Sequence, residues 1–340
     1  MSLNPVDYVL PMTDSTVPLV LGAGKVLGNT VPFGPEAAFS TLSHKGEVLR
    51  LARDAGVSVP QSREMEPAVG IEEVNDAVSA VGGFPVVLKP CCSRIWSGKR
   101  FLSGKVKVVA SREELEAVLG SDPVFRYGSF LVQDVIQGYG AGLFVLFDGG
   151  TGTAWFSHRR IRERPPAGGV STLSESTSLN EPLQKAAEKI LKQTGWQGPA
   201  MIEFKIAPDG VPYLMEINAR FWGSLQLAID SGIDFPYLSC NMGRRRDDDV
   251  SAQGRYKVGV RNRWFLGDLD HLYLTFRGNR KLVQKFRTLA SFVLAVSDRS
   301  SRNEVFRLED IKPGIIELLQ YFRRNETTEL SALHQSLEHH

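Results

Sequence analysis

Two carboxylates, an amide and a guanidinium lie close together in one predicted β-hairpin of this chain. The hairpin is centred on residues 207–210, whose sequence APDG is typical of a tight turn. Side chains two residues apart on a strand share a face, so Glu216, Asn218 and Arg220 are expected to project together. With regular pairing, Glu203 on the preceding strand lies beside them.

This arrangement indicates metal and phosphate chemistry. Carboxylate and amide oxygens suit Mg²⁺, and two such ions about 3.5–4 Å apart clamp a phosphoryl group in transfer. A guanidinium beside them is suited to phosphate or developing negative charge. A solvent-facing hairpin with a few charges is the alternative.

The register of the hairpin sets how close the two carboxylates come. Pairing that is symmetric about the turn places Glu203 opposite Leu214, with Glu216 as its diagonal neighbour about 7–8 Å away at the backbone. Met215 and Ile217 then alternate with the polar residues on the other face of the strand.

The motif Glu216-x-Asn218-x-Arg220, preceded by Glu203 on a strand, resembles the metal site of the ATP-grasp superfamily. Carbamoyl phosphate synthetase, biotin carboxylase and D-alanine:D-alanine ligase belong to that superfamily. The resemblance extends over about residues 41–240. It implies an α+β chain of ATP-grasp fold, in which two α/β lobes with antiparallel sheets sandwich ATP.

The resemblance also implies a domain organisation. The family usually has a whole doubly wound domain before the nucleotide-binding fold, and only the last strand–helix unit of such a Rossmann-like domain is expected here. The predicted parts are this remnant with its linker helix, the small lobe, the large lobe with the metal site, and a C-terminal strand, helices and tag: 1–62, 63–134, 135–245 and 246–340.

Two lysines are candidates for phosphate binding. Lys89 ends the apolar segment 85–90 and resembles the family's phosphate-binding lysine on a rigid strand. Lys45 lies near the start of a helix predicted over 41–53, with Ser43 as its N-cap. From there it either reaches phosphate or belongs to a solvated helix face. The family's glycine-rich phosphate loop is replaced by a segment with one glycine at 91–100.

The strand predicted over 129–138 resembles the family's hinge strand, which binds adenine through its backbone. The base edge is expected to meet the main chain at Asp134, Val135 and Ile136, with Gln133 near the exocyclic amine. An ordinary sheet strand is the alternative.

A second predicted hairpin covers 143–147 and 153–161 and continues into basic residues. His158, Arg160 and Arg162 share one strand face, which resembles a phosphate-bordering strand of relatives of carbamoyl phosphate synthetase. Arg160 is therefore expected to contact phosphate, although plain solvent exposure also explains charges at alternate positions.

Further elements are predicted from periodicity and capping signals. They are strands at 7–11, 105–109 and 255–264, helices at 71–81, 181–193, 224–231 and 232–240, and a mainly helical region over 268–325.

Composition restricts the class of protein. The chain has 340 residues, 42% hydrophobic and 23% charged, with a net charge of +2, which gives no reason to expect nucleic acid or membrane binding. Cys91, Cys92 and Cys240 show neither a disulfide framework nor zinc spacing, so a reducing cytoplasm is expected. His339 and His340 resemble a purification tag.

The resemblance to ATP-grasp enzymes implies an enzyme that phosphorylates a carboxylate with Mg-ATP and joins the acyl phosphate to an amine or a thiol. Arg220, Arg160 and Lys89 are expected to act in catalysis, with ATP and two Mg²⁺ ions as the expected cofactors (Mn²⁺ able to substitute). The alternatives are a bicarbonate-dependent enzyme like carbamoyl phosphate synthetase and a nucleotide-binding module without turnover. Small-molecule substrates and a homodimer are the expected partners.

Overall fold

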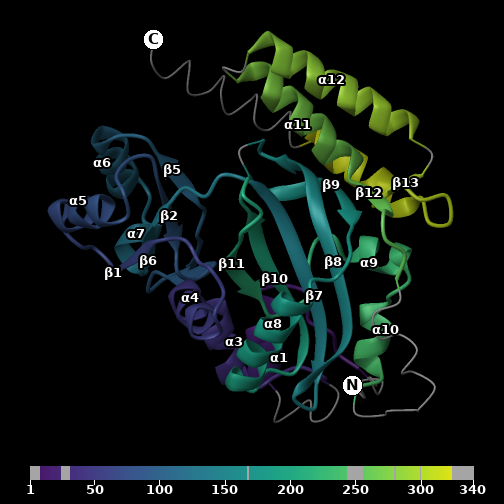
Figure 1. Cartoon of the computed structure of the whole chain (residues 1–340), viewed down its shortest axis with the longest axis horizontal. Helices are drawn as coiled ribbons and strands as arrows, with labels where there is room; N and C mark the ends of the chain where they lie inside the picture. Colours follow the sequence, from purple (N-terminus) through teal and green to yellow (C-terminus); the bar gives the residue numbers. More distant parts are fainter. Residues whose placement is uncertain are drawn as a thin grey trace. The chain divides into compact units, whose positions relative to one another are not determined.

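The computed structural model describes residues 8–23, 31–166, 168–242, 256–278, 281–298 and 300–323. The chain divides into two compact units, Met1–Arg159 with Thr177–Tyr256 and Arg160–Ser176 with Lys257–His340. Both contain helices and strands, and antiparallel pairing predominates among the described strands, so the predicted α+β class is confirmed (Figure 1).

A small antiparallel sheet forms one part of the first unit. Its strand order is β1-β6-β2-β5, and the bounds are β1 (Ser62–Met65), β2 (Val86–Pro90), β5 (Lys107–Val109) and β6 (Phe130–Asp134). One face of this sheet packs on helix α5 (Ile71–Ala80) through buried residues of alternate strand positions, among them Val86, Leu88, Phe130 and Val132.

Because side chains alternate along a strand, the opposite face of the small sheet carries the other set of residues. Lys89 pairs with Leu131 and Val87 pairs with Gln133, so these four side chains share that face. The core thus fixes which side of the sheet Lys89 and Gln133 occupy.

The rest of this region consists of short elements. The segment 91–100, which replaces the family's phosphate loop, contains β3 (Arg94–Trp96), and β3 pairs antiparallel with β4 (Phe101–Ser103) just beyond this segment. The helices that follow β5 are α6 (Arg112–Ser121), whose N-cap Ser111 accepts from the amide of Glu114, and α7 (Val124–Tyr127).

The larger sheet of the first unit has the strand order β11-β10-β7-β8. The bounds are β7 (Tyr139–Asp148), β8 (Thr151–Arg164), β10 (Gly198–Ile206) and β11 (Pro212–Asn218), and the last five residues of β8 belong to the second unit. Helix α8 (Glu181–Thr194) ends as predicted at Gly195, whose φ of 68° suits a residue without a side chain. Helices α9 (Leu225–Ser231) and α10 (Phe235–Cys240) follow β11.

The N-terminal helices differ in part from the prediction. The strand expected at 7–11 is not formed by residues 8–11, while α1 (Thr16–Gly22) is present. The single helix expected over 41–53 is two helices, α3 (Glu36–Ser43) and α4 (Lys45–Asp54). His44 separates them and caps α4, because its Nδ1 accepts from the amide of Glu47 at 3.4 Å; the predicted cap Ser43 is wrong.

In the second unit, β9 (Val170–Ser176) pairs antiparallel with β12 (Arg261–Arg263), which pairs parallel with β13 (Ser301–Asn303). The strand expected over 255–264 is therefore reduced to three residues, and the region expected to be helical includes β13. Its helices are α11 (Phe265–Arg277), α12 (Leu282–Ser297) and a helix at 312–323. Within the described part of the chain, no helix is both long and apolar enough to cross a membrane.

A buried ion network anchors this unit. Asp268 is fully buried and accepts from Nε and Nη2 of Arg162 at 2.6 and 2.7 Å and from Nε of Arg263 at 2.7 Å. Arg162 therefore has a structural role, and the solvent-exposed interpretation is wrong for this residue, whereas the phosphate-bordering interpretation of its strand stays a prediction.

Candidate nucleotide and metal site

The predicted metal-binding hairpin is formed by β10 and β11, but its register differs from the symmetric one. Phe204 pairs with Leu214 and Glu203 pairs with Glu216, so Met215 is an extra residue in β11. This β-bulge overturns the predicted pairing of Glu203 with Leu214. It places the two carboxylates directly opposite each other instead of on a diagonal.

The bulge also changes which residues of β11 face the core. Leu214 and Ile217 are buried, whereas Met215 is only half-buried. The expectation that Met215 and Ile217 share the buried face is therefore wrong. An extra residue in one strand shifts the alternation by one position, which sequence periodicity alone does not show.

Glu216 is held between two ammonium groups. Its Oε2 lies 3.3 Å from Nζ of Lys89 and 3.5 Å from Nζ of Lys45, and its Oε1 lies 3.3 Å from Nδ2 of Asn218. Burial acts to raise the pKa of Glu216, but the charges of Lys89 and Lys45, with the Asn218 amide, outweigh it and hold this pKa well below its ordinary value.

Both lysines are positioned by rigid elements. Lys89 lies on β2, is only 6% exposed, and donates a second hydrogen bond to the carbonyl of Met215 at 3.2 Å. Lys45 is the first residue of α4, which packs against β11, and is 8% exposed. The interpretation of Lys45 as part of a solvated face is therefore wrong.

Arg220 lies just beyond the end of β11, beside Asn218. Its Nε and Nη2 donate to the two carboxylate oxygens of Asp14 at 2.5 and 2.9 Å. Its Nη2 also donates to Oδ1 of Asn218 at 3.0 Å, and its Nη1 donates to the carbonyl of Phe221 at 2.8 Å. The guanidinium thus adjoins the predicted metal ligands, and a carboxylate holds it in a two-point contact.

The predicted adenine strand is β6, which is shorter than expected. Gln133 is fully buried on the Lys89 face; its Nε2 donates to Oγ of Ser62 at 2.9 Å, and its Oε1 has no hydrogen-bond partner. Asp134 pairs with Val86, which puts its side chain on the opposite face, and burial raises the pKa of this carboxyl. Val135 and Ile136 follow the end of the strand.

The structure does not join Arg160 to this group of residues. Arg160 belongs to the second unit, where its Nη1 donates to Glu163 at 2.9 Å and to the carbonyl of Gly169 at 3.1 Å. Its predicted role in phosphate binding stays a prediction.

Two contacts of the site were missed from sequence. Asp14 precedes Arg220 by about two hundred positions, and no short motif links them. The carbonyl of Met215 becomes available through a bulge that strand alternation hides. The available signal in the sequence was that β11 is a nearly regular apolar strand with one residue more than regular pairing with β10 requires.

The donor set of the hairpin fits Mg²⁺. Glu203 and Glu216 are opposite one another, and Asn218 is two residues further along β11, so oxygen-bearing side chains of neighbouring strands converge. Hard oxygen ligands, few in number, are what Mg²⁺ takes from proteins.

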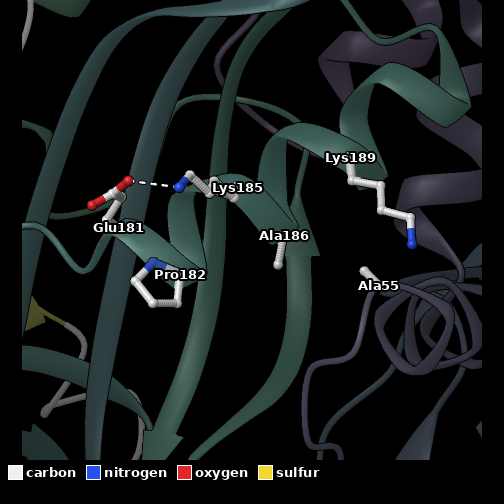
Figure 2. Close-up of a pocket in the computed structure, with 6 residues that line it drawn as sticks. All are labelled: Ala55, Glu181, Pro182, Lys185, Ala186 and Lys189. Carbon is white, nitrogen blue, oxygen red and sulfur yellow. Dashed lines mark ion pairs between the residues drawn. The ribbon is translucent and has the colours of Figure 1, made fainter.

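A hollow elsewhere in the first unit has no such chemistry. It lies between α8 and the end of α4 and is lined by Ala55, Pro182, Ala186 and three charged residues (Figure 2). Lys185 is paired with Glu181 at 2.6 Å, and Lys189 donates to the carbonyl of Asp54 at 2.6 Å. Its ammonium groups already have partners in the chain, so the hollow is not the candidate site.

Comparisons with known proteins agree with the fold. Residues 130–264 match the family model described as ATP-grasp in the biosynthetic pathway with Ter operon. A stretch of 74 residues is 36% identical to the succinate–CoA ligase [ADP-forming] subunit beta of Hydrogenobaculum sp. (strain Y04AAS1). It covers 22% of this chain and 18% of that protein.

Solved structures give the wider match. An L-amino acid ligase from Bacillus licheniformis is 20% identical with a TM-score of 0.55, over 74% of this chain and 60% of the ligase. A biotin carboxylase from Campylobacter jejuni is 18% identical with a TM-score of 0.56, over 75% of this chain and 58% of the carboxylase. The chain thus spans less than two thirds of each of these proteins.

The chain has the ATP-grasp fold, which it shares with these solved structures over about three quarters of its length. The part of the chain that contains β6 to β12 is similar to the ATP-grasp family found with the Ter operon.

Proposed function

We propose that this protein is an ADP-forming ligase that phosphorylates a carboxylate with Mg-ATP and joins the resulting acyl group to an amine. The observation that carries the proposal is the position of Glu216, directly opposite Glu203 and between the ammonium groups of Lys89 and Lys45. Two carboxylates and two ammonium groups thus lie together, which supports the proposal that they bind metal and phosphate.

The chemistry requires such an assembly. A carboxylate oxygen attacks the γ-phosphorus, the bond to the β-phosphate oxygen breaks, and ADP leaves. The amine nitrogen then attacks the acyl carbon, phosphate leaves, and the nitrogen loses a proton. Charge accumulates on phosphate oxygens during the first step, and fixed cations stabilise it.

The residues have distinct roles in this proposal. Mg²⁺ held by Glu203, Glu216 and Asn218 would neutralise phosphate charge. Lys89 and Lys45, now paired with Glu216, are placed to bind phosphate oxygens as point charges. Arg220 stabilises the transferred phosphoryl group, and Asp14 orients its guanidinium.

A covalent enzyme intermediate is not expected at this site. Among the described residues near the two lysines, Cys91 is the obvious nucleophile, but burial raises the pKa of its thiol to about 12. A neutral thiol is a weak nucleophile. This supports direct transfer of the phosphoryl group to the carboxylate.

A second candidate is a nucleotide-binding module without turnover. It is favoured by one observation, the two-point contact of Arg220 with Asp14, which occupies the guanidinium edge suited to a phosphate. This candidate predicts ATP binding without substrate-dependent release of ADP.

The test is to incubate the protein with Mg-ATP, single amino acids as carboxylates, and hydroxylamine in place of the amine. We expect a hydroxamate together with ADP and phosphate, and loss of both in Glu216→Ala. Lys185→Met, which removes an exposed lysine, is the matched control and should retain activity.

Other products would change the assignment. AMP and pyrophosphate would mean adenylation and would contradict the proposal. Parallel reactions with coenzyme A as the thiol and with bicarbonate as the carboxylate distinguish a thiol ligase and a carbamoyl phosphate synthetase-like enzyme from an amine ligase. The homodimer, the second Mg²⁺ and the cytoplasmic location stay predictions.

A further inference from the structure

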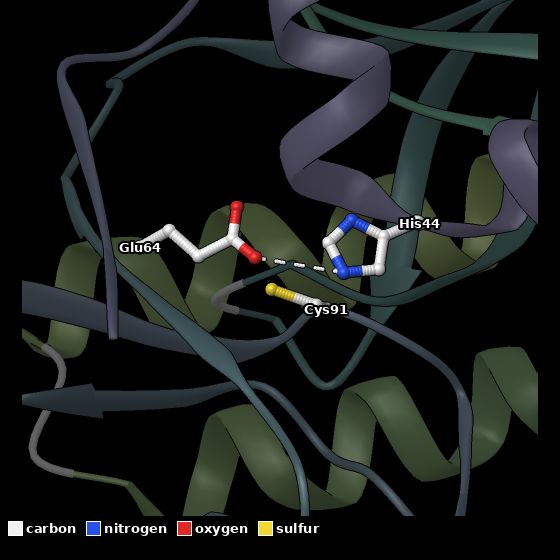
Figure 3. A group of neighbouring side chains, drawn as sticks. All are labelled: His44, Glu64 and Cys91. Atoms are coloured by element: carbon white, nitrogen blue, oxygen red, sulfur yellow. Dashed lines mark ion pairs between the residues drawn. The ribbon is translucent and has the colours of Figure 1, made fainter. Parts of the chain in front are cut away.

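Three metal-ligating side chains of different chemistry meet beside the two lysines. His44, Glu64 and Cys91 point toward one another, and their ligand atoms all lie within 4.8 Å of each other (Figure 3). Nε2 of His44 lies 3.5 Å from Oε1 of Glu64. They come from the α3–α4 junction, from β1 and from the residue after β2, positions far apart in the sequence.

Backbone hydrogen bonds connect the three segments that carry these side chains. The amide of Cys91 donates to the carbonyl of Ser129 at 2.9 Å, and the carbonyl of Cys91 accepts from the amide of Lys45 at 2.9 Å. Glu64 pairs with Leu131, on the strand that follows Ser129. The three side chains are therefore held on one hydrogen-bonded framework, as a preformed binding site requires.

The absence of a side chain at Gly46 leaves room for the Glu64 carboxylate. A Cβ at position 46 would lie 2.0 Å from Oε2 of Glu64, so the carboxylate rests directly against the start of α4. This close approach keeps Glu64 beside His44, and any larger residue at position 46 must displace it.

We propose that His44, Glu64 and Cys91 form a binding site for one divalent cation of borderline softness, such as Zn²⁺. Imidazole, carboxylate and thiolate are the side chains that bind Zn²⁺, and three protein ligands leave a fourth position for water. A tetrahedral site with the usual bond lengths separates its donor atoms by about 3.4–3.6 Å. The His44–Glu64 distance already has this value, and Cys91 has to approach by at most about 1.4 Å.

Binding of the cation changes the protonation of two of the three ligands. The thiol of Cys91 releases its proton to solvent and binds as the thiolate. In His44 the proton moves from Nε2 to Nδ1, so that Nε2 has a free electron pair for the cation. In this tautomer Nδ1 no longer accepts from the amide of Glu47, so the N-cap hydrogen bond, which is weak at 3.4 Å, is lost.

The sulfur ligand distinguishes this site from the Mg²⁺ site of the proposed function, because thiolates select Zn²⁺ and disfavour Mg²⁺. The location gives the cation a role. His44 immediately precedes Lys45, and Cys91 follows Lys89 by two residues. A cation that joins His44 to Cys91 fixes the backbone positions from which both lysines reach Glu216.

The experiment measures zinc directly and does not depend on nucleotide. Chelator-treated full-length protein, with His339 and His340 replaced by alanine, is dialysed against Zn²⁺ in excess Mg²⁺, and bound zinc is quantified. We expect about one Zn²⁺ per chain, and a sulfur-to-metal charge-transfer band when Co²⁺ is used instead.

Variants assign the ligands. Cys91→Ser and His44→Asn should each abolish binding, and Asn at position 44 retains an N-cap oxygen, so α4 is preserved. Gly46→Ala should weaken binding by displacing Glu64. Cys92→Ser and Cys240→Ser are the matched controls among the free cysteines and should bind normally.

Two results overturn the site: the absence of stoichiometric zinc, or zinc binding that persists in Cys91→Ser or in His44→Asn. In the first case His44 is only a helix cap that donates to Glu64. Either result leaves the ligase proposal intact, since that proposal rests on the hydroxamate assay.

Discussion

Nζ of Lys89 lies 3.2 Å from the carbonyl oxygen of Met215, the one residue of β11 that has no partner in β10. In a regular antiparallel ladder, a carbonyl that faces the neighbouring strand is used in a hydrogen bond to that strand. The bulge therefore both brings Glu203 opposite Glu216 and gives Lys89 a backbone partner. One extra residue therefore positions the proposed metal ligands and the lysine proposed to bind phosphate together.

Replacing Lys89 by methionine is expected to weaken Mg-ATP binding about 10- to 100-fold, the effect of losing one charge-assisted hydrogen bond. Lys45→Met should have a smaller effect, because its ammonium makes the longer contact with Glu216. Calorimetric titration measures both. Equal affinities of Lys89→Met and the control Lys185→Met would show that Lys89 does not bind the nucleotide.

Replacing Glu216 by glutamine should destabilise the protein by about 1–3 kcal/mol, because two buried ammonium groups lose their carboxylate. The pKa of Glu216 is lowered from its ordinary 4.5, so its stabilising effect is present above that pH and is lost as the pH falls toward the lower value. The difference in free energy of unfolding between wild type and Glu216→Gln should therefore be about 1 kcal/mol smaller at about pH 4 than at neutral pH. Urea unfolding at both pH values tests this, and a gap that widens in acid would contradict it.

Replacing Asp14 by asparagine should lower the rate of ADP formation about tenfold, because Arg220 loses the carboxylate that orients it. The affinity for ATP should stay nearly unchanged. Steady-state kinetics and calorimetry separate the two effects. Asp209→Asn, in the exposed turn of the same hairpin, is the control. Faster turnover in Asp14→Asn would mean that Asp14 restrains Arg220 instead of orienting it.

Replacing Asp268 by asparagine should destabilise the second unit by about 3–5 kcal/mol, since Arg162 and Arg263 are then buried without their shared counter-charge. Asp54→Asn removes an exposed partner of Arg50 at 3.6 Å and should change stability by less than about 1 kcal/mol. Thermal unfolding of the two variants provides the comparison. Similar midpoints would show that the network is not stabilising.

Much of the fold was predictable from sequence because the signals were local. Helix α8 has an asparagine cap and a glycine just past its end, and β2 is a short apolar segment; both were predicted within a residue or two. The motif at Glu216, Asn218 and Arg220 and the apolar setting of Lys89 identified residues that the structure brings into contact, and their functional roles stay predictions. The α+β class followed from the same segments and is confirmed.

The errors have a common physical cause, which is that tertiary contacts outweigh local patterns. His44 is a poor cap by propensity, yet its imidazole caps α4 and also contacts Glu64. Arg162 lies in an alternating basic strand that reads as exposed, yet Asp268, more than one hundred residues away, pairs with it in the interior. The bulge at Met215 likewise depends on pairing across strands, which single-strand alternation does not encode.

The pairing of Glu216 with Lys45 and Lys89 has a consequence for how ionic strength affects the protein. The unliganded site already has an internal counterion, so a nucleotide phosphate would replace one anion by another at the two ammonium groups and would displace no salt anions from them. Added salt then screens the attraction of the two lysines to Glu216 as well as their attraction to the nucleotide phosphate. Nucleotide affinity should therefore depend less steeply on salt concentration than it would in a site with two lysines and no carboxylate between them.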